Sequence, residues 1–208
     1  MHRSREFKPL KYQSLKGFSD YQIKKHHEIV YADHVKRLNA IENKIDSLNA
    51  SQHTLPQDFW EVKIEEVAEK NAVKLHEAYF AEMGAGTNTP VGEIAKMIKD
   101  DFGSYEAWKK EFMAAAFASR GWVILAYDLD DNKLVNYLAD LSQAGGVWNA
   151  VIILAIDCCE HSYASESNPD HQAYIESFMK NIDWDYVNLE AHQYGIIDRR
   201  KNSNRLKL

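Results

Sequence analysis

An aspartate, two cysteines, a glutamate and a histidine follow directly after a strongly apolar segment of the chain. The apolar segment, residues 151–156, is typical of a buried strand, and the sequence turns polar at Asp157. A carboxylate at the end of a core strand is costly to bury unless a positive group compensates it. One helical turn places Asp157 and His161 on the same face, and this oxygen–nitrogen pair suits iron, manganese or zinc. The alternative is an ordinary helix start, with an acid near the positive end of the helix dipole.

Three further histidines lie on helices predicted upstream of this segment. His26 and His34 lie close to the apolar stripe of one long helix, and His76 shares a face with Tyr79 on the next. A lone inward histidine is more often a hydrogen-bonded core residue than a metal ligand. Several imidazoles beside a buried acid favour a metal ion, because uncompensated polar burial is expensive. The pattern alone leaves both interpretations open. The candidate metal ligands are His26, His76, Asp157 and His161.

Other catalytic patterns are missing from the sequence. The residues after His27 do not complete the His-Glu-x-x-His motif of zinc proteases. A glycine-rich nucleophile elbow, a phosphate-binding loop and a dinucleotide fingerprint are also missing. The net charge of −6 and the lack of a long basic run argue against nucleic acid as the main partner.

The composition indicates a packed globular protein. The chain has 208 residues, of which 45% are hydrophobic and 12% aromatic. Its two cysteines, Cys158 and Cys159, are adjacent and cannot join distant segments, which fits a reducing compartment. We find neither a signal peptide nor an apolar run long enough to span a bilayer, so we expect a cytoplasmic protein without a membrane partner.

Helical periodicity dominates the first half of the chain. Two long helices are predicted at about residues 21–49 and 57–83, and they can pair as an antiparallel hairpin. The glycine-rich segment 84–90 is the clearest linker, so we expect an N-terminal domain at 1–88 and a C-terminal domain at 89–208. The apolar stripe of the first helix comprises Ile23, Val30, Leu38, Ile41, Ile45 and Leu48.

The second half of the chain mixes helices and strands. Helices are predicted at 91–101 and 104–119, followed by strands at 121–127, 133–138 and 150–156. Two closing helices are predicted near 170–181 and 184–194. The polar tail that begins at Asp198 is expected to fray.

Three sequence motifs resemble those of the iron/manganese superoxide dismutases. Asp157-x-x-Glu160-His161-x-Tyr163 is similar to the family signature Asp-x-Trp-Glu-His-x-Tyr. Lys25-His26 followed by Val35-x-x-Leu38-Asn39 resembles the motif of the family's first helix. Asn71-Ala72-x-x-x-His76-x-x-Tyr79 resembles the motif of its second helix. The resemblance covers nearly all of residues 20–190. It implies an α+β fold, with a long antiparallel helical hairpin packed on a C-terminal domain with a three-stranded antiparallel sheet and helices.

The resemblance also implies an activity and a cofactor. It implies that the protein is a superoxide dismutase, an oxidoreductase that converts superoxide to dioxygen and hydrogen peroxide at a mononuclear iron or manganese site, one ion per subunit. In the family the positions of His26, His76, Asp157 and His161 are the metal ligands. A non-catalytic relative of the same fold, or a metalloenzyme of a different reaction on the same ligands, stays open as an alternative.

The surroundings of the site follow from the same resemblance. Tyr79 and Trp122 match aromatic residues that wall the metal site, and Trp184 matches one that packs close to the metal. Gln143, in a predicted loop, is the candidate for holding the metal-bound solvent, because Ala72 stands at the alternative helix position.

An assembly is implied as well. Glu160 and Tyr163 lie where relatives form a two-fold interface. We therefore expect at least a homodimer, in which Glu160 bonds to His161 of the partner subunit.

Three positions depart from the usual family pattern. His34 stands where the family usually has a tyrosine that gates the substrate entrance. Val30 replaces a histidine that pairs across the dimer, and Cys159 replaces the tryptophan of the signature. Free imidazole titrates near pH ~6.5 and free tyrosine near ~10, so a gate formed by His34 is predicted to lose activity as pH rises through the neutral range.

Overall fold

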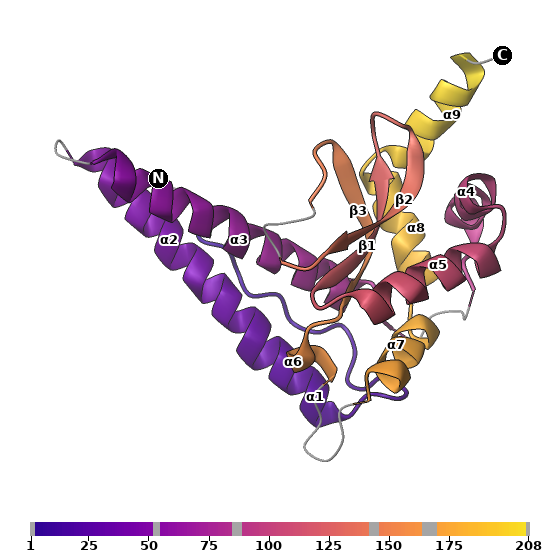
Figure 1. The fold of residues 1–208 in the computed structure, drawn as a ribbon, viewed down its shortest axis with the longest axis horizontal. Helices are drawn as coiled ribbons and strands as arrows, with labels where there is room; N and C mark the ends of the chain where they lie inside the picture. The colour runs from indigo at the N-terminus through magenta and orange to yellow at the C-terminus, as the bar shows by residue number, and fades with distance from the viewer. Residues whose placement is uncertain (1–2, 52–54, 85–88, 142–145, 164–169, 207–208) are drawn as a thin grey trace.

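Two long helices form an antiparallel pair along one side of the molecule (Figure 1). The computed structural model describes residues 3–51, 55–84, 89–141, 146–163 and 170–206. The pair consists of α2 (Ala32–Ala50) and α3 (Pro56–Ala81). Pro56 is the first residue of α3, where its missing N–H has no helical partner to lose. The predicted helical hairpin is confirmed.

A short π-helical segment precedes α2 and changes which residues face the core. The chain enters through α1 (Asp20–Lys24), continues as the π-helix η1 (Lys25–Tyr31) and then becomes α2. The stripe expected from a 3.6-residue period placed Val30 inside, but Val30 is only half-buried and Tyr31 is 1% exposed. Hydrogen bonds in a π-helix span five residues, so each turn takes up more of the chain than an α-turn. Val30 lies at the edge of the buried face, as do Ile41 and Leu48 of the same stripe, whereas Ile23, Leu38 and Ile45 are buried.

Three antiparallel strands form the sheet at the centre of the second half of the chain. These strands are β1 (Trp122–Asp128), β2 (Lys133–Ala139) and β3 (Ala150–Asp157), in the order β2-β1-β3. The register pairs Trp122 with Asp157, so the last residue of β3 lies beside the first residue of β1. The predicted α+β class and three-stranded sheet are confirmed.

Helices surround the sheet and complete the core (Figure 1). They are α4 (Gly92–Phe102), α5 (Tyr105–Ala118), α7 (His171–Lys180) and α8 (Trp184–Gln193). The hairpin helix α3 contacts β3, and α5 contacts β1 and β2. Among the residues that the structure describes, no helix combines the length and apolar character that crossing a bilayer requires.

The polar C-terminal segment forms a helix rather than fraying. Helix α9 (Ile196–Leu206) begins with Ile196 and Ile197, which are both buried. Further along α9, Arg200 binds Asp101 of α4, with 2.5 Å between Nη2 and Oδ1. The expectation of a frayed tail was therefore wrong. The two buried isoleucines that precede the polar tail start the helix, and within the tail Arg200 pairs with a residue 99 positions away.

Candidate metal centre

Four elements each bring one side chain to a single point between the hairpin and the sheet. His26 comes from η1, His76 from α3, Asp157 from the end of β3, and His161 from the short helix α6 (Glu160–Tyr163). One ligand atom from each of these side chains lies within 4.8 Å of the others. The structure thus brings together all four residues that were selected from the sequence as candidate ligands.

The three imidazoles converge on one oxygen of Asp157. Their Nε2 atoms lie 3.1 Å (His26), 3.6 Å (His76) and 2.9 Å (His161) from Asp157 Oδ2. Asp157 is 0% exposed. Its other oxygen, Oδ1, accepts a hydrogen bond from the backbone N–H of Cys159, at 2.9 Å. This bond fixes the carboxylate with Oδ2 toward the imidazoles.

The tautomer of His76 follows from its hydrogen bond to the backbone. Nδ1 lies 2.7 Å from the carbonyl oxygen of Ala72, and a carbonyl can only accept, so Nδ1 carries the proton. Nε2 of the neutral ring then has a free lone pair that points toward Asp157. Within the described part of the chain, the buried Nε2 atoms of His26 and His76 have no hydrogen-bond partner. Such unsatisfied buried atoms are expensive in a native protein unless a ligand completes them.

Burial sets the protonation of the cluster. It lowers the pKa of His76 to about 3. It also lowers the pKa of His26, although the neighbouring Asp157 acts to raise that pKa. Burial alone raises the pKa of Asp157, but the adjacent imidazoles of His161 and His26 outweigh it and hold that pKa well below its usual range. Neutral imidazoles and an ionised carboxylate are the states that bind a metal ion.

The donor set fits iron or manganese. Three imidazole nitrogens and one carboxylate oxygen form a mixed nitrogen–oxygen site without thiolate, the type that suits these ions. The nearby thiols are free: Cys158 is buried, Cys159 is half-buried, and burial raises the pKa of both. The unsatisfied Nε2 atoms of His26 and His76 are aimed where such an ion would sit.

Aromatic side chains wall the centre, as expected for Tyr79 and Trp122. The ring of Trp122 packs edge-on against His76 with centroids 5.0 Å apart, and that of Tyr79 lies 5.1 Å from His26. The Tyr174 hydroxyl lies 2.6 Å from the carbonyl oxygen of Asp157 and 3.1 Å from the Tyr79 hydroxyl. Because the carbonyl only accepts, Tyr174 donates its proton there and Tyr79 donates to Tyr174.

Trp184 lies in a different part of the core. Its ring packs against Trp108, at 5.5 Å between centroids, and against Tyr105 at 6.3 Å. Among the described residues it has no ring contact with a candidate ligand. Trp184 thus joins the start of α8 to α5, and its expected place close to the metal stays a prediction.

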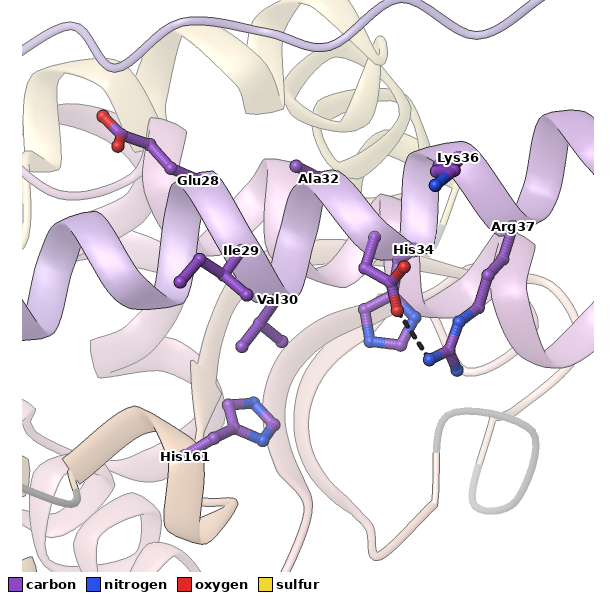
Figure 2. A pocket seen from close by; sticks show the side chains of 9 residues that line it. Glu28, Ile29, Val30, Ala32, His34, Lys36, Arg37 and His161 are labelled. Atoms are coloured by element: carbon purple, nitrogen blue, oxygen red, sulfur yellow. Dashed lines mark ion pairs between the residues drawn. The ribbon is translucent and has the colours of Figure 1, made fainter.

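A cavity of about 530 Å³ lies outside the centre and reaches His161. Its lining includes Val30, Asp33, His34, Lys36, Arg37 and His161. In Figure 2, His34, Arg37 and His161 lie on the same side of the helix that carries His34. The His161 side chain is 34% exposed, whereas His26 and His76 are buried, so this entrance cavity reaches the centre from the His161 side. The ring of His34 lies 5.1 Å from that of His76.

Two residues near the centre were missed from the sequence, and one prediction cannot be placed. Glu69 binds His34, and its separation of seven residues from His76 was a usable signal, because it corresponds to two helical turns. Tyr174 lies in the closing helix predicted near 170–181, and nothing local predicted its bond to Asp157. Gln143 lies outside the described residues.

Glu160 and Tyr163 border a second cavity on the outer side of α6. This cavity has a volume of about 580 Å³ and is also lined by Arg120 and His171. Glu160 is exposed, and the ring of Tyr163 stacks on His171 with centroids 4.5 Å apart. The buried Nε2 atom of His171 has no hydrogen-bond partner among the described residues.

Comparison with known proteins agrees with the fold and the donor set. Residues 90–190 match the family model of the C-terminal domain of iron/manganese superoxide dismutases. A relative from Aquifex aeolicus named as an iron superoxide dismutase is 33% identical over 193 residues, which cover 90% of this chain and 91% of that relative. One of the same name from Cupriavidus metallidurans is 37% identical, covering 86% and 92%. A manganese superoxide dismutase from Haloferax volcanii is 42% identical, over 53% of this chain and 56% of its own length.

The matches to the Aquifex and Cupriavidus relatives extend across both halves of the chain. The chain therefore belongs to the iron/manganese superoxide dismutase family.

Proposed function

We propose that the protein converts superoxide to dioxygen and hydrogen peroxide at an iron or manganese ion held by His26, His76, Asp157 and His161. The observation that carries this proposal is the convergence of three imidazole Nε2 atoms on one oxygen of a fully buried carboxylate. Iron or manganese supplies the one-electron chemistry, and its charge exceeds that of the single carboxylate, so the centre attracts an anion.

The chain's own residues hold and orient the centre. The Ala72 carbonyl fixes the tautomer of His76, and the Cys159 N–H fixes the Asp157 carboxylate. Such outer contacts set ligand orientation and basicity. Tyr79 packs against His26, and burial raises its pKa well above the usual value, so it keeps its proton and donates it to Tyr174.

The entrance cavity is the proposed route for superoxide. His34 and His161 line it, and the basic side chains of Lys36 and Arg37 lie at the same cavity. The acids Glu28 and Asp33 line the same cavity, and Arg37 is paired with Asp33, so attraction of the anionic substrate rests on the charge of the metal centre itself. We further propose His34 as the gating residue and Gln143 as the residue that holds the bound solvent.

Metal analysis paired with a superoxide-consumption assay on one sample tests the function. Wild type is expected to carry close to one iron or manganese ion per subunit and to consume superoxide. Asp157→Ala and His161→Ala are expected to lose both metal and activity, because each removes one of four protein ligands. Near-stoichiometric metal with full turnover in either variant contradicts the ligand assignment.

The organisation of the chain completes the proposal. We propose an N-terminal domain at 1–88 and a C-terminal domain at 89–208, which the start of the family match at residue 90 supports. We also propose a cytoplasmic homodimer with Glu160 and Tyr163 at its interface, and neither nucleic acid nor membrane as a partner. The exposed Glu160 and the unpartnered, buried Nε2 of His171 support an interface at this surface.

A further inference from the structure

We propose that Glu69 is a positioning residue that holds the imidazole of His34 with Nδ1 on its carboxylate and Nε2 open to the entrance cavity. This inference rests on the proposed function, because His34 matters for turnover only if superoxide enters through this cavity. Glu69 lies on α3 and His34 on α2, so their contact also joins the two hairpin helices.

The contact between the two side chains is short and sheltered. His34 Nδ1 lies 2.6 Å from Glu69 Oε2, and the two side chains are only 24% and 16% exposed. A charge-assisted hydrogen bond of this length is stronger than a neutral one. Glu69 is also 3.9 Å from Nη1 of Arg37, which binds Asp33 at 2.6 Å through Nη2. Arg37 thus lies near the Glu69 carboxylate, beyond hydrogen-bond distance, while Glu69 binds His34.

The hydrogen bond determines which nitrogen of His34 serves the cavity. A carboxylate only accepts, so Nδ1 is the donor and carries a proton. In the neutral ring Nε2 is then an acceptor with a free lone pair. Within the described part of the chain, Nε2 of His34 has no hydrogen-bond partner, and it is not fully buried. His34 itself lines the cavity. Nε2 is therefore the atom that meets an incoming molecule.

The position of His34 makes its orientation consequential. Its ring lies 5.1 Å from that of the candidate ligand His76, and it shares the cavity with His161 (Figure 2). Without Glu69 the ring can rotate about its side-chain bonds and exchange the two nitrogens. A hydrogen-bonding group that is misplaced by about 1 Å can cost roughly 10²-fold in rate. Glu69 thus acts on the reaction through His34 without touching the centre.

Nitrogen-15 spectra of the histidines test the orientation without measuring activity. The probe is the full-length protein loaded with diamagnetic gallium(III), at a pH above the range in which free imidazole titrates. In wild type, His34 is expected to show a protonated Nδ1 and an unprotonated Nε2. The signals of His34 are assigned as those that disappear in His34→Ala. Glu69→Ala is expected to move His34 toward the Nε2-protonated tautomer. Glu69→Gln is expected to restore the wild-type pattern, because an amide oxygen also accepts.

Turnover in the iron- or manganese-loaded enzyme tests whether Glu69 acts through His34. Glu69→Ala is expected to lower turnover roughly tenfold at unchanged metal content, and Glu69→Gln to recover most of that loss. In a His34→Ala background, Glu69→Ala is expected to have no further effect. Glu65→Ala, which removes an exposed acid one turn earlier on α3, is the control for the loss of charge and is expected to match wild type.

Three results overturn the inference. The first is a wild-type His34 that is protonated on Nε2, and the second is a His34 tautomer that does not change in Glu69→Ala. The third is an equal loss of turnover from Glu69→Ala with and without His34. If the loaded protein consumes no superoxide, the proposed function fails, while the nitrogen spectra still decide whether Glu69 positions His34.

Discussion

A second buried carboxyl group lies apart from the metal centre, at Glu82. The side chain is 3% exposed, and its Oε2 accepts a hydrogen bond from the backbone N–H of Ala155 at 2.8 Å. Burial raises the pKa of Glu82 well above its usual value, and the negative charge of Glu190 acts in the same direction. Glu82 is therefore protonated in the folded protein under conditions where an exposed carboxyl is ionised.

This raised pKa makes stability depend on pH in a definite direction. In the unfolded chain Glu82 loses its proton near pH ~4.3. Above that pH the unfolded state releases a proton that the folded state keeps, so the contribution of Glu82 to stability falls as pH rises toward its folded pKa. Glu82→Gln cannot ionise and keeps an oxygen for Ala155. The variant is expected to melt about 2–4 °C higher than wild type at pH 7, the shift that ~1 kcal/mol gives in a chain of this size.

Thermal unfolding at pH 7 and near pH 4 measures this effect. The gain in Glu82→Gln is expected to shrink at the lower pH, where both states of the wild-type residue are protonated. The exposed Glu106, changed to Gln, is the control and is expected to leave the melting temperature unchanged at both pH values. A gain of equal size at both pH values contradicts the raised pKa.

At the residue scale, the candidate ligands could be predicted from sequence because each lies in a short motif with a fixed spacing. The tautomer of His76 could have been predicted too, since its partner Ala72 is four residues away on the same helix. The bond of Tyr174 to Asp157 could not, because it joins residues 17 positions apart that are brought together only by tertiary packing.

At the scale of elements, α9 depends on one ion pair. Arg200 and Asp101 have side chains that are only 14% and 8% exposed. Asp101 also accepts a hydrogen bond from the backbone N–H of Leu134 at 2.8 Å, so it connects α9, α4 and the start of β2. Removing one partner of a largely buried ion pair leaves an uncompensated charge, which is costly.

Arg200→Ala is therefore expected to lower the free energy of unfolding by about 3 kcal/mol. Chemical denaturation followed by circular dichroism measures the change. Lys201→Ala is the matched control, since Lys201 binds Glu93 through side chains that are 49% and 36% exposed. Such a pair contributes less than ~1 kcal/mol. Equal effects of the two variants contradict the anchoring role of Arg200.

The helices and strands themselves could be predicted where periodicity is local and regular. Helix α3 and all three strands were expected within a few residues of their observed ends, whereas the first predicted helix, 21–49, is divided into α1, η1 and α2. The π-helix η1 was not predicted, because the apolar pattern was interpreted with the 3.6-residue period of an α-helix. Hydrogen bonds in a π-helix span five residues, so that period does not hold there. Helix α9 was missed for a different reason, since its main ion pair reaches α4 across the whole C-terminal half.

At the scale of the whole molecule, the surface around α6 carries exposed residues that fit the proposed interface. Glu160 is exposed although it lies next to a candidate ligand, and the nearby Phe117 is 45% exposed. The cavity between Glu160, Tyr163 and His171 adjoins this surface. An isologous contact brings the same residues of two copies together about a two-fold axis, so one surface of this kind is enough for a closed dimer.

The protein is expected to be at least a dimer, with Glu160 bonded to His161 of the partner subunit. Sedimentation over a concentration series measures the dissociation constant of the assembly. Glu160→Ala is expected to raise this constant at least about tenfold, because the loss of a charge-assisted hydrogen bond of ~1.4 kcal/mol has that effect. Glu106→Ala, on an exposed face of α5, is the control and is expected to leave the constant unchanged. A strict monomer with intact activity at working concentration refutes this assembly. Val30 has no side-chain hydrogen-bonding group, so in the proposed dimer more of the polar contact between subunits is expected to depend on Glu160.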